Sequence, residues 1–214
     1  MKDLVIFGAG GFGREVVLLV ENINLHRPKT YRILGFVVDD AYFEPNTVIN
    51  SIPVVGNFSW LVEHKDEVCC TIAIADPKTR ENVFKRLDSY GIELETLISP
   101  DVYVDPTTKI GRGCYLGYRT LLGPNMIIGD GVFFNSDCMF GHDDVIGDFT
   151  TVLPRATISG SCTIGSGVMI GGAAYIVPGK KIGDRAVIAA GSVVFSNVKA
   201  DTHVMGNPAK KIVL

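Results

Sequence analysis

The chain lacks the features of several common protein classes. Its 214 residues carry a formal net charge of -3 without any block of like charges, which argues against a nucleic-acid partner or an anionic membrane surface. No apolar segment approaches the length that spans a bilayer, and the one in "MKDLVIFGAGG" is too short for a secretory signal. We therefore expect a cytoplasmic protein without a membrane partner.

Cysteine is scarce as well. The five cysteines are an odd number and form no CxxC pair, a pattern that argues against both a disulfide framework and a zinc site. We expect them to be packing residues.

Before residue 98, short β-branched runs alternate with helical patterns, as in "LVIFG", "REVVLLVENI", "RILGFVVDD" and "PKTRENVFKRLDSYG". This alternation predicts a small parallel α/β unit over residues 1–97. Pro77 after Asp76 indicates the start of a helix, because proline at the first helical position loses no hydrogen bond.

From residue 98 onward the sequence has a period of six. Every sixth position from 98 to 194 is Ile, Val, Leu or Phe, and glycine often follows, as in "IGRG", "IGDG" and "IGSG". The residue two places earlier is usually small or apolar, so both columns should point inward, since residues two apart on a strand share a face. Such hexads predict a parallel β-helix over residues 98–214, with the α/β unit capping one end.

The whole chain resembles the PglD/NeuD type of bacterial nucleotide-sugar N-acetyltransferase. The resemblance is carried by "GAGGFGREV", "VVDD", the hexads, "GHDDVIGD" and "GNPAK". It implies a small Rossmann-like parallel sheet followed by a left-handed β-helix with three hexads in each triangular coil, an exception to the usual right-handed crossover. It also implies that "VMGNPAKKI" is the closing segment at the C-terminal end of the β-helix, and that the protein is a homotrimer with sites between subunits.

The same resemblance implies the reaction. The family transfers an acetyl group from acetyl-CoA, a co-substrate, to an amine on a nucleotide-linked deoxy sugar. We expect a 4-amino-4,6-dideoxy sugar linked to UDP, dTDP or GDP, made for a surface glycan or a glycoprotein.

The glycine cluster "GAGGFG" follows a predicted strand and precedes a predicted helix. Small residues let the backbone approach a phosphate, and a helix N-terminus favours negative charge. The alternatives are a tight turn that binds nothing and a full dinucleotide site, for which fewer than a hundred residues before the hexads are too few. The resemblance places the nucleotide here, with the acids holding base or ribose and the arginine facing the diphosphate. The predicted substrate residues are Gly8, Gly10, Gly11, Gly13, Arg14, Asp39 and Asp40.

His142 is the histidine that lies in the regular hexads, within "GHDDVIGD". Spacing alone leaves a surface histidine without a role as an alternative. Coils of eighteen residues would stack His142 between Pro124 and Gly160, and the glycine would leave a cleft open beside the imidazole. The resemblance to the family motif implies that His142 is the general base and that Asp143 is the carboxylate that orients it. Histidine suits this role because it gains and loses protons near neutral pH.

Other positions follow from the resemblance. It places Asn135 near the sugar and the pantetheine arm of acetyl-CoA along Gly160, Gly171 and Ala189, while Thr151 stands where some relatives have another histidine. Asp144 is unusual, because it falls in the small inward column, where an unpaired carboxylate is costly. We expect it to reach water or a backbone donor rather than to take a direct part in catalysis.

Three alternatives differ in their chemistry. A metalloenzyme of the γ-carbonic anhydrase kind needs three histidines on zinc, and the hexads contain only His142, so we expect no metal. The sequence does not exclude O-acetylation of sialic acid or another sugar. A non-catalytic nucleotide-binding protein would keep both folds and release no thiol from acetyl-CoA.

Overall fold

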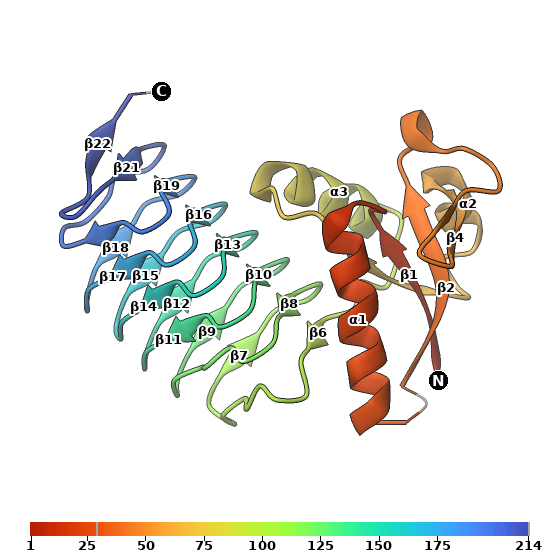
Figure 1. Cartoon of the computed structure of the whole chain (residues 1–214), viewed down its shortest axis with the longest axis horizontal. Helices are drawn as coiled ribbons and strands as arrows, with labels where there is room; N and C mark the ends of the chain where they lie inside the picture. Colours follow the sequence, from red (N-terminus) through yellow and green to blue (C-terminus); the bar gives the residue numbers. More distant parts are fainter. Residues whose placement is uncertain (29, 214) are drawn as a thin grey trace.

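The computed structural model describes residues 1–28 and 30–213. The chain forms an α/β unit followed by a stack of short strands, with the α/β unit against the first coils and the C-terminal strands at the far end (Figure 1). No helix within the described ranges is both long and apolar enough to cross a membrane.

The α/β unit is built on a sheet of five strands in the order β3-β4-β2-β1-β5. Its strands are β1 (Lys2–Phe7), β2 (Tyr31–Val38), β3 (Val48–Ile49), β4 (Ile52–Asn57) and β5 (Cys69–Ile72). Its helices are α1 (Gly11–His26), a 3-10 turn (Asp40–Tyr42), α2 (Phe58–Glu63) and α3 (Pro77–Ser89). The sheet is parallel apart from the β3–β4 hairpin. This is the predicted alternating unit, with a hairpin that the sequence did not indicate.

The central strand β1 explains how the helices are placed. Residues 4–7 are all buried, as expected for a strand covered on both faces. Leu4 and Ile6 pack in the cluster that includes the apolar face of α1, whereas Val5 and Phe7 pack in the cluster that includes α2 and α3. Alternate side chains of one strand therefore support the two helical layers.

The start of α3 is the predicted one. Pro77 is the first residue of the helix, and the Asp76 carboxylate accepts a hydrogen bond from the Thr79 backbone N–H at 2.8 Å. The cap satisfies a donor that the helix leaves without a partner.

The rest of the chain is a left-handed parallel β-helix with three faces. The first face carries β6 (Leu97–Ile98), β8 (Tyr115–Leu116), β10 (Phe133–Phe134), β13 (Thr151–Val152), β16 (Met169–Ile170), β19 (Val187–Ile188), β21 (His203–Met205) and β22 (Lys210–Ile212). The second carries β11 (Met139–Phe140), β14 (Thr157–Ile158), β17 (Tyr175–Ile176) and β20 (Val193–Val194). The third carries β7 (Lys109–Ile110), β9 (Ile127–Ile128), β12 (Val145–Ile146), β15 (Thr163–Ile164) and β18 (Lys181–Ile182).

Register and burial confirm the hexad interpretation. Phe133 pairs with Thr151 and Thr151 with Met169, so residues eighteen apart stack. The predicted inward column forms one continuous hydrophobic core. The closing segment ends in β22, which turns back antiparallel on β21.

The three cysteines of the hexads precede strands on three different faces and are fully buried: Cys114, Cys138 and Cys162. Burial raises the pKa of the Cys114 and Cys138 thiols to about 12. All three pack in the core of the β-helix, as predicted.

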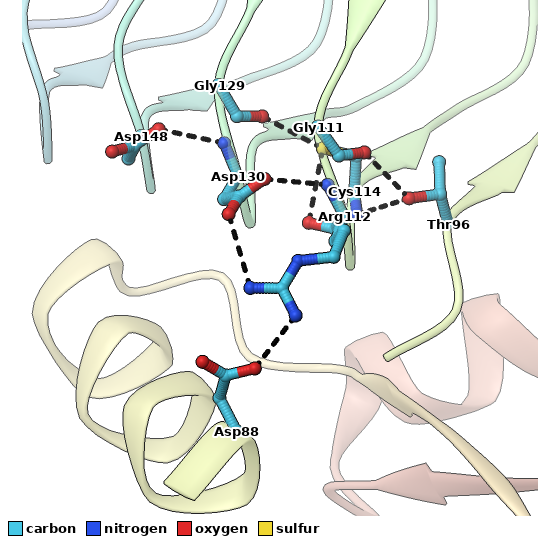
Figure 2. Close-up of polar contacts among 8 residues, drawn as sticks. All are labelled: Asp88, Thr96, Gly111, Arg112, Cys114, Gly129, Asp130 and Asp148. Atoms are coloured by element: carbon cyan, nitrogen blue, oxygen red, sulfur yellow. Dashed lines mark hydrogen bonds and ion pairs between the residues drawn. The ribbon is translucent and has the colours of Figure 1, made fainter. Parts of the chain in front are cut away.

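Polar contacts join the two units. Figure 2 shows Arg112, at a corner of the first coils, donating to Asp88 of α3 at 2.8 Å and facing Asp130 of the next corner. Arg80 of α3 makes a second, buried link, described below. The predicted domain boundary between residues 97 and 98 falls inside β6, and it remains a prediction.

Candidate active site

His142 lies in the turn between β11 and β12, at an outer corner of the β-helix. Its side chain is 64% exposed, and Nδ1 lies 2.6 Å from Asp143 Oδ2. With an ionised carboxylate as its partner, Nδ1 carries the proton and donates it to Asp143, so a neutral ring keeps Nε2 as an acceptor. The predicted pair is therefore in contact, and a nitrogen remains available to a substrate.

Asp143 is held from two sides. Its backbone has φ of +60°, a conformation that recurs every six residues at the corners of the coils. The Asn125 amide donates to Asp143 Oδ1 at 3.0 Å from the coil below. The hydrogen bond from His142 and then that from Asn125 lower the pKa of the Asp143 carboxyl. Sequence reasoning missed Asn125, although its place eighteen residues before Asp143 is the signal that would have found it.

The wall above the imidazole is Gly160. A Cβ added at this glycine would lie 2.9 Å from His142 Nε2 and 3.0 Å from Cδ2, so a side chain there would displace the ring. Asp143 N donates to the Pro124 carbonyl at 3.0 Å, and Ser161 N donates to the His142 carbonyl at 2.8 Å. The predicted stacking of this corner is present.

Asp144 is fully buried and has two backbone donors. Oδ1 accepts from Cys162 N at 2.8 Å, and Oδ2 accepts from Gly141 N at 3.1 Å. Burial raises the pKa of the Asp144 carboxyl to about 7. The expected backbone contact is thus found.

The glycine cluster has two kinds of members. Gly8 has φ of +113°, and a Cβ at Gly13 would overlap the Gly8 carbonyl oxygen, so these two are needed for the strand-to-helix turn. By contrast, a Cβ at Gly10 would meet no atom within 4 Å, and one at Gly11 would lie 3.7 Å from the Arg14 side chain. The turn alone does not require Gly10 and Gly11, which leave the start of α1 open to a ligand.

A cavity of about 330 Å³ lies beside this turn. It is lined by Phe7, Gly8, Ala9, Gly10, Val38, Asp39, Tyr42, Ile74, Thr79 and Val83. Apolar walls with one carboxylate at the edge suit a flat ring that carries a few polar groups. Arg14 instead lines a separate cavity with Leu18 and Asn50.

Asp39 has a partner that sequence reasoning missed. Arg86 of α3 donates to Asp39 Oδ1 at 2.8 Å and lies 4.0 Å from Asp40 Oδ2. The Arg86 guanidinium also lies 3.5 Å from the centre of the Phe58 ring. No spacing signal connects these residues, because they come from three separate elements.

The remaining predicted residues lie elsewhere. Asn135, Gly171 and Ala189 directly follow β10, β16 and β19, at the corner between the first and second faces. His142 and Gly160 follow β11 and β14, at the corner between the second and third faces. One protomer therefore brings Gly160 to His142 but places the other three residues on a different edge.

Thr151 is a link between the two units. It is fully buried, donates to the Ala75 carbonyl at 2.7 Å and accepts from Arg80 at 2.9 Å.

In the described part of the chain, no group of three or more His, Cys, Asp or Glu side chains could hold a metal ion.

Two family models match the chain. The PglD N-terminal domain matches residues 3–87, and the bacterial transferase hexapeptide model, with six repeats, matches residues 161–196.

Three solved proteins are similar over the full length. The acetyltransferase domain of PglB from Neisseria gonorrhoeae FA1090 is 27% identical with a TM-score of 0.88, and the match spans 99% of this chain and 100% of that domain. The same domain has also been solved in complex with acetyl coenzyme A. WeeI from Acinetobacter baumannii AYE is 30% identical with a TM-score of 0.87, over 99% of this chain and 100% of its own. PerB from Caulobacter crescentus, solved with CoA and GDP-perosamine, is 23% identical with a TM-score of 0.76 over 100% and 98%, and supports the fold only.

The glycine turn with its cavity, the unbroken hexads and the His142–Asp143 corner agree with these matches in both halves of the chain. The chain belongs to the PglD/NeuD-type family of bacterial nucleotide-sugar N-acetyltransferases, the hexapeptide-repeat acyltransferases with a left-handed β-helix.

Proposed function

We propose that this protein transfers the acetyl group of acetyl-CoA to the amine of a nucleotide-linked amino-deoxy sugar. The observation that carries the proposal is the His142–Asp143 pair, in a chain of this family. Nδ1 of His142 contacts Asp143, whereas Nε2 lies beside Gly160 and is not used in that contact. The acetyl coenzyme A bound by the PglB acetyltransferase domain supports the choice of donor.

In this mechanism His142 is the general base. The unprotonated amine attacks the thioester carbonyl, and Nε2 takes the amine proton as the N–C bond forms. The C–S bond then breaks, and the imidazolium returns the proton to the departing CoA thiolate. Asp143 keeps the proton on Nδ1 and stabilises the imidazolium, because its depressed pKa keeps it ionised at neutral pH.

The nucleotide end of the substrate belongs in the cavity beside the glycine turn. The nucleobase fits its apolar walls, and the diphosphate lies over Gly10 and Gly11 at the start of α1, where backbone N–H groups and the helix dipole favour negative charge. Asp39, positioned by Arg86, accepts a hydrogen bond from the base or the ribose. Arg14 lines the neighbouring cavity, and its predicted contact with the diphosphate requires its side chain to turn toward Gly11.

A complete site requires two subunits. The α/β unit contacts Gly131, Phe149 and Thr151, next to the first face of the β-helix, whereas His142 lies at another corner. Asn135, Gly171 and Ala189 lie on the opposite edge of the second face. In a homotrimer, a neighbouring chain supplies the second wall, so the sugar and the pantetheine arm reach His142 between subunits.

Exposed apolar side chains support this assembly. On the second face Leu121, Met139 and Tyr175 point outward and are 58%, 48% and 40% exposed, and on the third face Ile127 and Val145 are 50% and 37% exposed. A column of this kind is typical of a surface that another chain covers.

We also propose a cytoplasmic location, where acetyl-CoA and nucleotide sugars are available.

The test is release of CoA thiol from acetyl-CoA in the presence of 4-amino-4,6-dideoxy sugars linked to UDP, dTDP or GDP, including GDP-perosamine. We expect turnover with at least one of them and a product that survives hydroxylamine, which cleaves esters but not amides. A hydroxylamine-sensitive product would indicate O-acetylation instead. If no amine or alcohol acceptor gives thiol release, the protein is not an acetyltransferase. The His142→Ala variant serves as the blank for the assay.

A further inference from the structure

Asp144 occupies a position that other hexads give to threonine. Thr96, Thr108 and Thr150 stand at the same place, two residues before an inward apolar residue. Each of their hydroxyl oxygens accepts from the backbone N–H eighteen residues later, at 3.1 to 3.3 Å. Figure 2 shows this contact between Thr96 and Cys114. At these three positions the side chain thus links one coil to the next.

Asp144 makes the same link and one more. Its Oδ1 accepts from Cys162 N, eighteen residues later, at 2.8 Å, as the threonines do. Its Oδ2 accepts from Gly141 N, three residues earlier, at 3.1 Å. A threonine has one hydroxyl oxygen, and Thr150 uses its proton to donate to the Gly165 carbonyl at 2.7 Å. The second contact is made by the second carboxylate oxygen of Asp144, which a threonine lacks.

Both contacts end beside His142. Gly141 immediately precedes the histidine, and Cys162 follows Ser161, whose N–H donates to the His142 carbonyl at 2.8 Å. The same upper segment contains Gly160, against which the imidazole rests. Because Asp144 is fully buried, its side chain has no freedom to swing away from these two donors.

We propose that Asp144 is a positioning residue for His142. Its carboxylate connects the turn that contains His142, through Gly141 N, to the next coil, through Cys162 N, and that coil packs against the imidazole. These contacts set the position of Nε2 relative to the bound amine. Asp144 does not touch the substrate. The kinetic part of this inference rests on the proposed function, because a small misplacement of a base is costly to the rate.

The experiment compares three variants. Asp144→Thr keeps the acceptor for Cys162 and loses the one for Gly141, Asp144→Cys weakens both, and Thr150→Val removes the equivalent coil-to-coil link in the same coil, away from the histidine. We expect kcat to fall about tenfold in Asp144→Thr and roughly a hundredfold in Asp144→Cys, with both KM values nearly unchanged. Thr150→Val should lower Tm and keep the wild-type kcat.

A second measurement does not need activity. In protein labelled with ¹⁵N-histidine, the ring signals of His142, identified by their loss in His142→Ala, should shift or broaden in Asp144→Thr and stay unchanged in Thr150→Val. If Asp144→Thr keeps both the wild-type ring signals and the wild-type kcat, Asp144 is a structural residue only and the proposal is wrong. If the wild-type protein transfers no acetyl group, the proposed function fails, and the ring signals alone decide the role of Asp144.

Discussion

Asp143 has two partners, and both favour its ionised form. The His142 ring and the Asn125 amide bind different carboxylate oxygens, so the pair is oriented before any substrate arrives. The orientation comes from two coils, because Asn125 lies eighteen residues before Asp143 and stacks beneath it. At this scale, the proposed chemistry depends on a few contacts at one exposed corner.

Replacing the two members of the pair should have unequal effects. We predict that His142→Ala lowers kcat by roughly a hundredfold or more, since the proposed general base is removed. Asp143→Asn should lower kcat less, because the amide oxygen still accepts the Nδ1 proton but no longer supplies the negative charge that stabilises the imidazolium during proton transfer. A wild-type kcat in Asp143→Asn would show that Asp143 does not orient the histidine.

Replacing the two acids beside the glycine-turn cavity, where we propose that the nucleotide binds, should affect the KM of one substrate only. We predict that Asp39→Ala and Asp40→Ala raise the KM for the nucleotide sugar and leave the KM for acetyl-CoA nearly unchanged. The larger effect should come from Asp39, which lines the cavity and accepts a hydrogen bond from Arg86 at 2.8 Å. Steady-state kinetics with each substrate varied in turn measure this. Equal changes in both constants would place the nucleotide elsewhere.

At the scale of single elements, α3 depends on its first turn. Asp76 accepts from the Thr79 hydroxyl and backbone N–H, which lower the pKa of the Asp76 carboxyl in that order. Loss of such a cap costs about 1 kcal/mol. The helix matters beyond its own stability, because it carries both Arg80 and Arg86 to their partners.

The cap predicts a pH-dependent stability. A carboxyl with a lowered pKa in the folded protein stabilises it above the unfolded pKa, and this contribution is lost as the pH falls through the folded value. Asp76→Ala should therefore lower the free energy of unfolding by about 1 kcal/mol at pH 7, with a much smaller difference near pH 2. Denaturant unfolding at both pH values measures it. A difference independent of pH would mean that the charge of Asp76 is not involved.

At the scale of the whole molecule, one arginine links the two units. Arg80 is 2% exposed, and its five N–H groups donate at 2.6 to 2.9 Å to acceptors from both units. These acceptors are the carbonyls of Ile74, Ala75, Gly131 and Phe149 and the Thr151 hydroxyl. Burial lowers the pKa of Arg80 to about 10, so it remains charged at neutral pH.

Removing this link should destabilise the protein. We predict that Arg80→Met costs about 3 kcal/mol or more, because it leaves several buried carbonyl groups without a donor. The control is Arg185→Met, whose guanidinium pairs with Asp201 at the surface and whose loss should matter little. Chemical denaturation compares the two. Equal stabilities would show that the units hold together without the arginine.

The assembly is the last property at this scale. We predict a homotrimer of three 23.1 kDa chains by light scattering, and its dissociation by Tyr175→Glu on the second face. Leu25→Glu, at an exposed position of α1, should leave the trimer intact. A stable and active monomer would remove the shared-site model.

Much of this architecture could be predicted from local patterns. The hexads, the buried cysteines, the Asp76–Pro77 helix start and the His142–Asp143 neighbours all depend on spacing along the chain, which the β-helix repeats without change. A period of six needs no long-range information, because each hexad meets the same environment as the next. Asn125 below Asp143 follows from the same repeat.

The remaining contacts depend on how separate elements pack. Arg86 meets Asp39, and Arg80 meets Thr151, because α3 lies between the cavity beside the glycine turn and the first face of the β-helix, and no period relates these residues. Whether the buried Asp144 carboxylate destabilises the fold or supports it likewise depends on which backbone N–H groups face it in the folded corner. Side-chain direction and the docking of the two units decide these contacts, since a pattern along the chain carries no record of either.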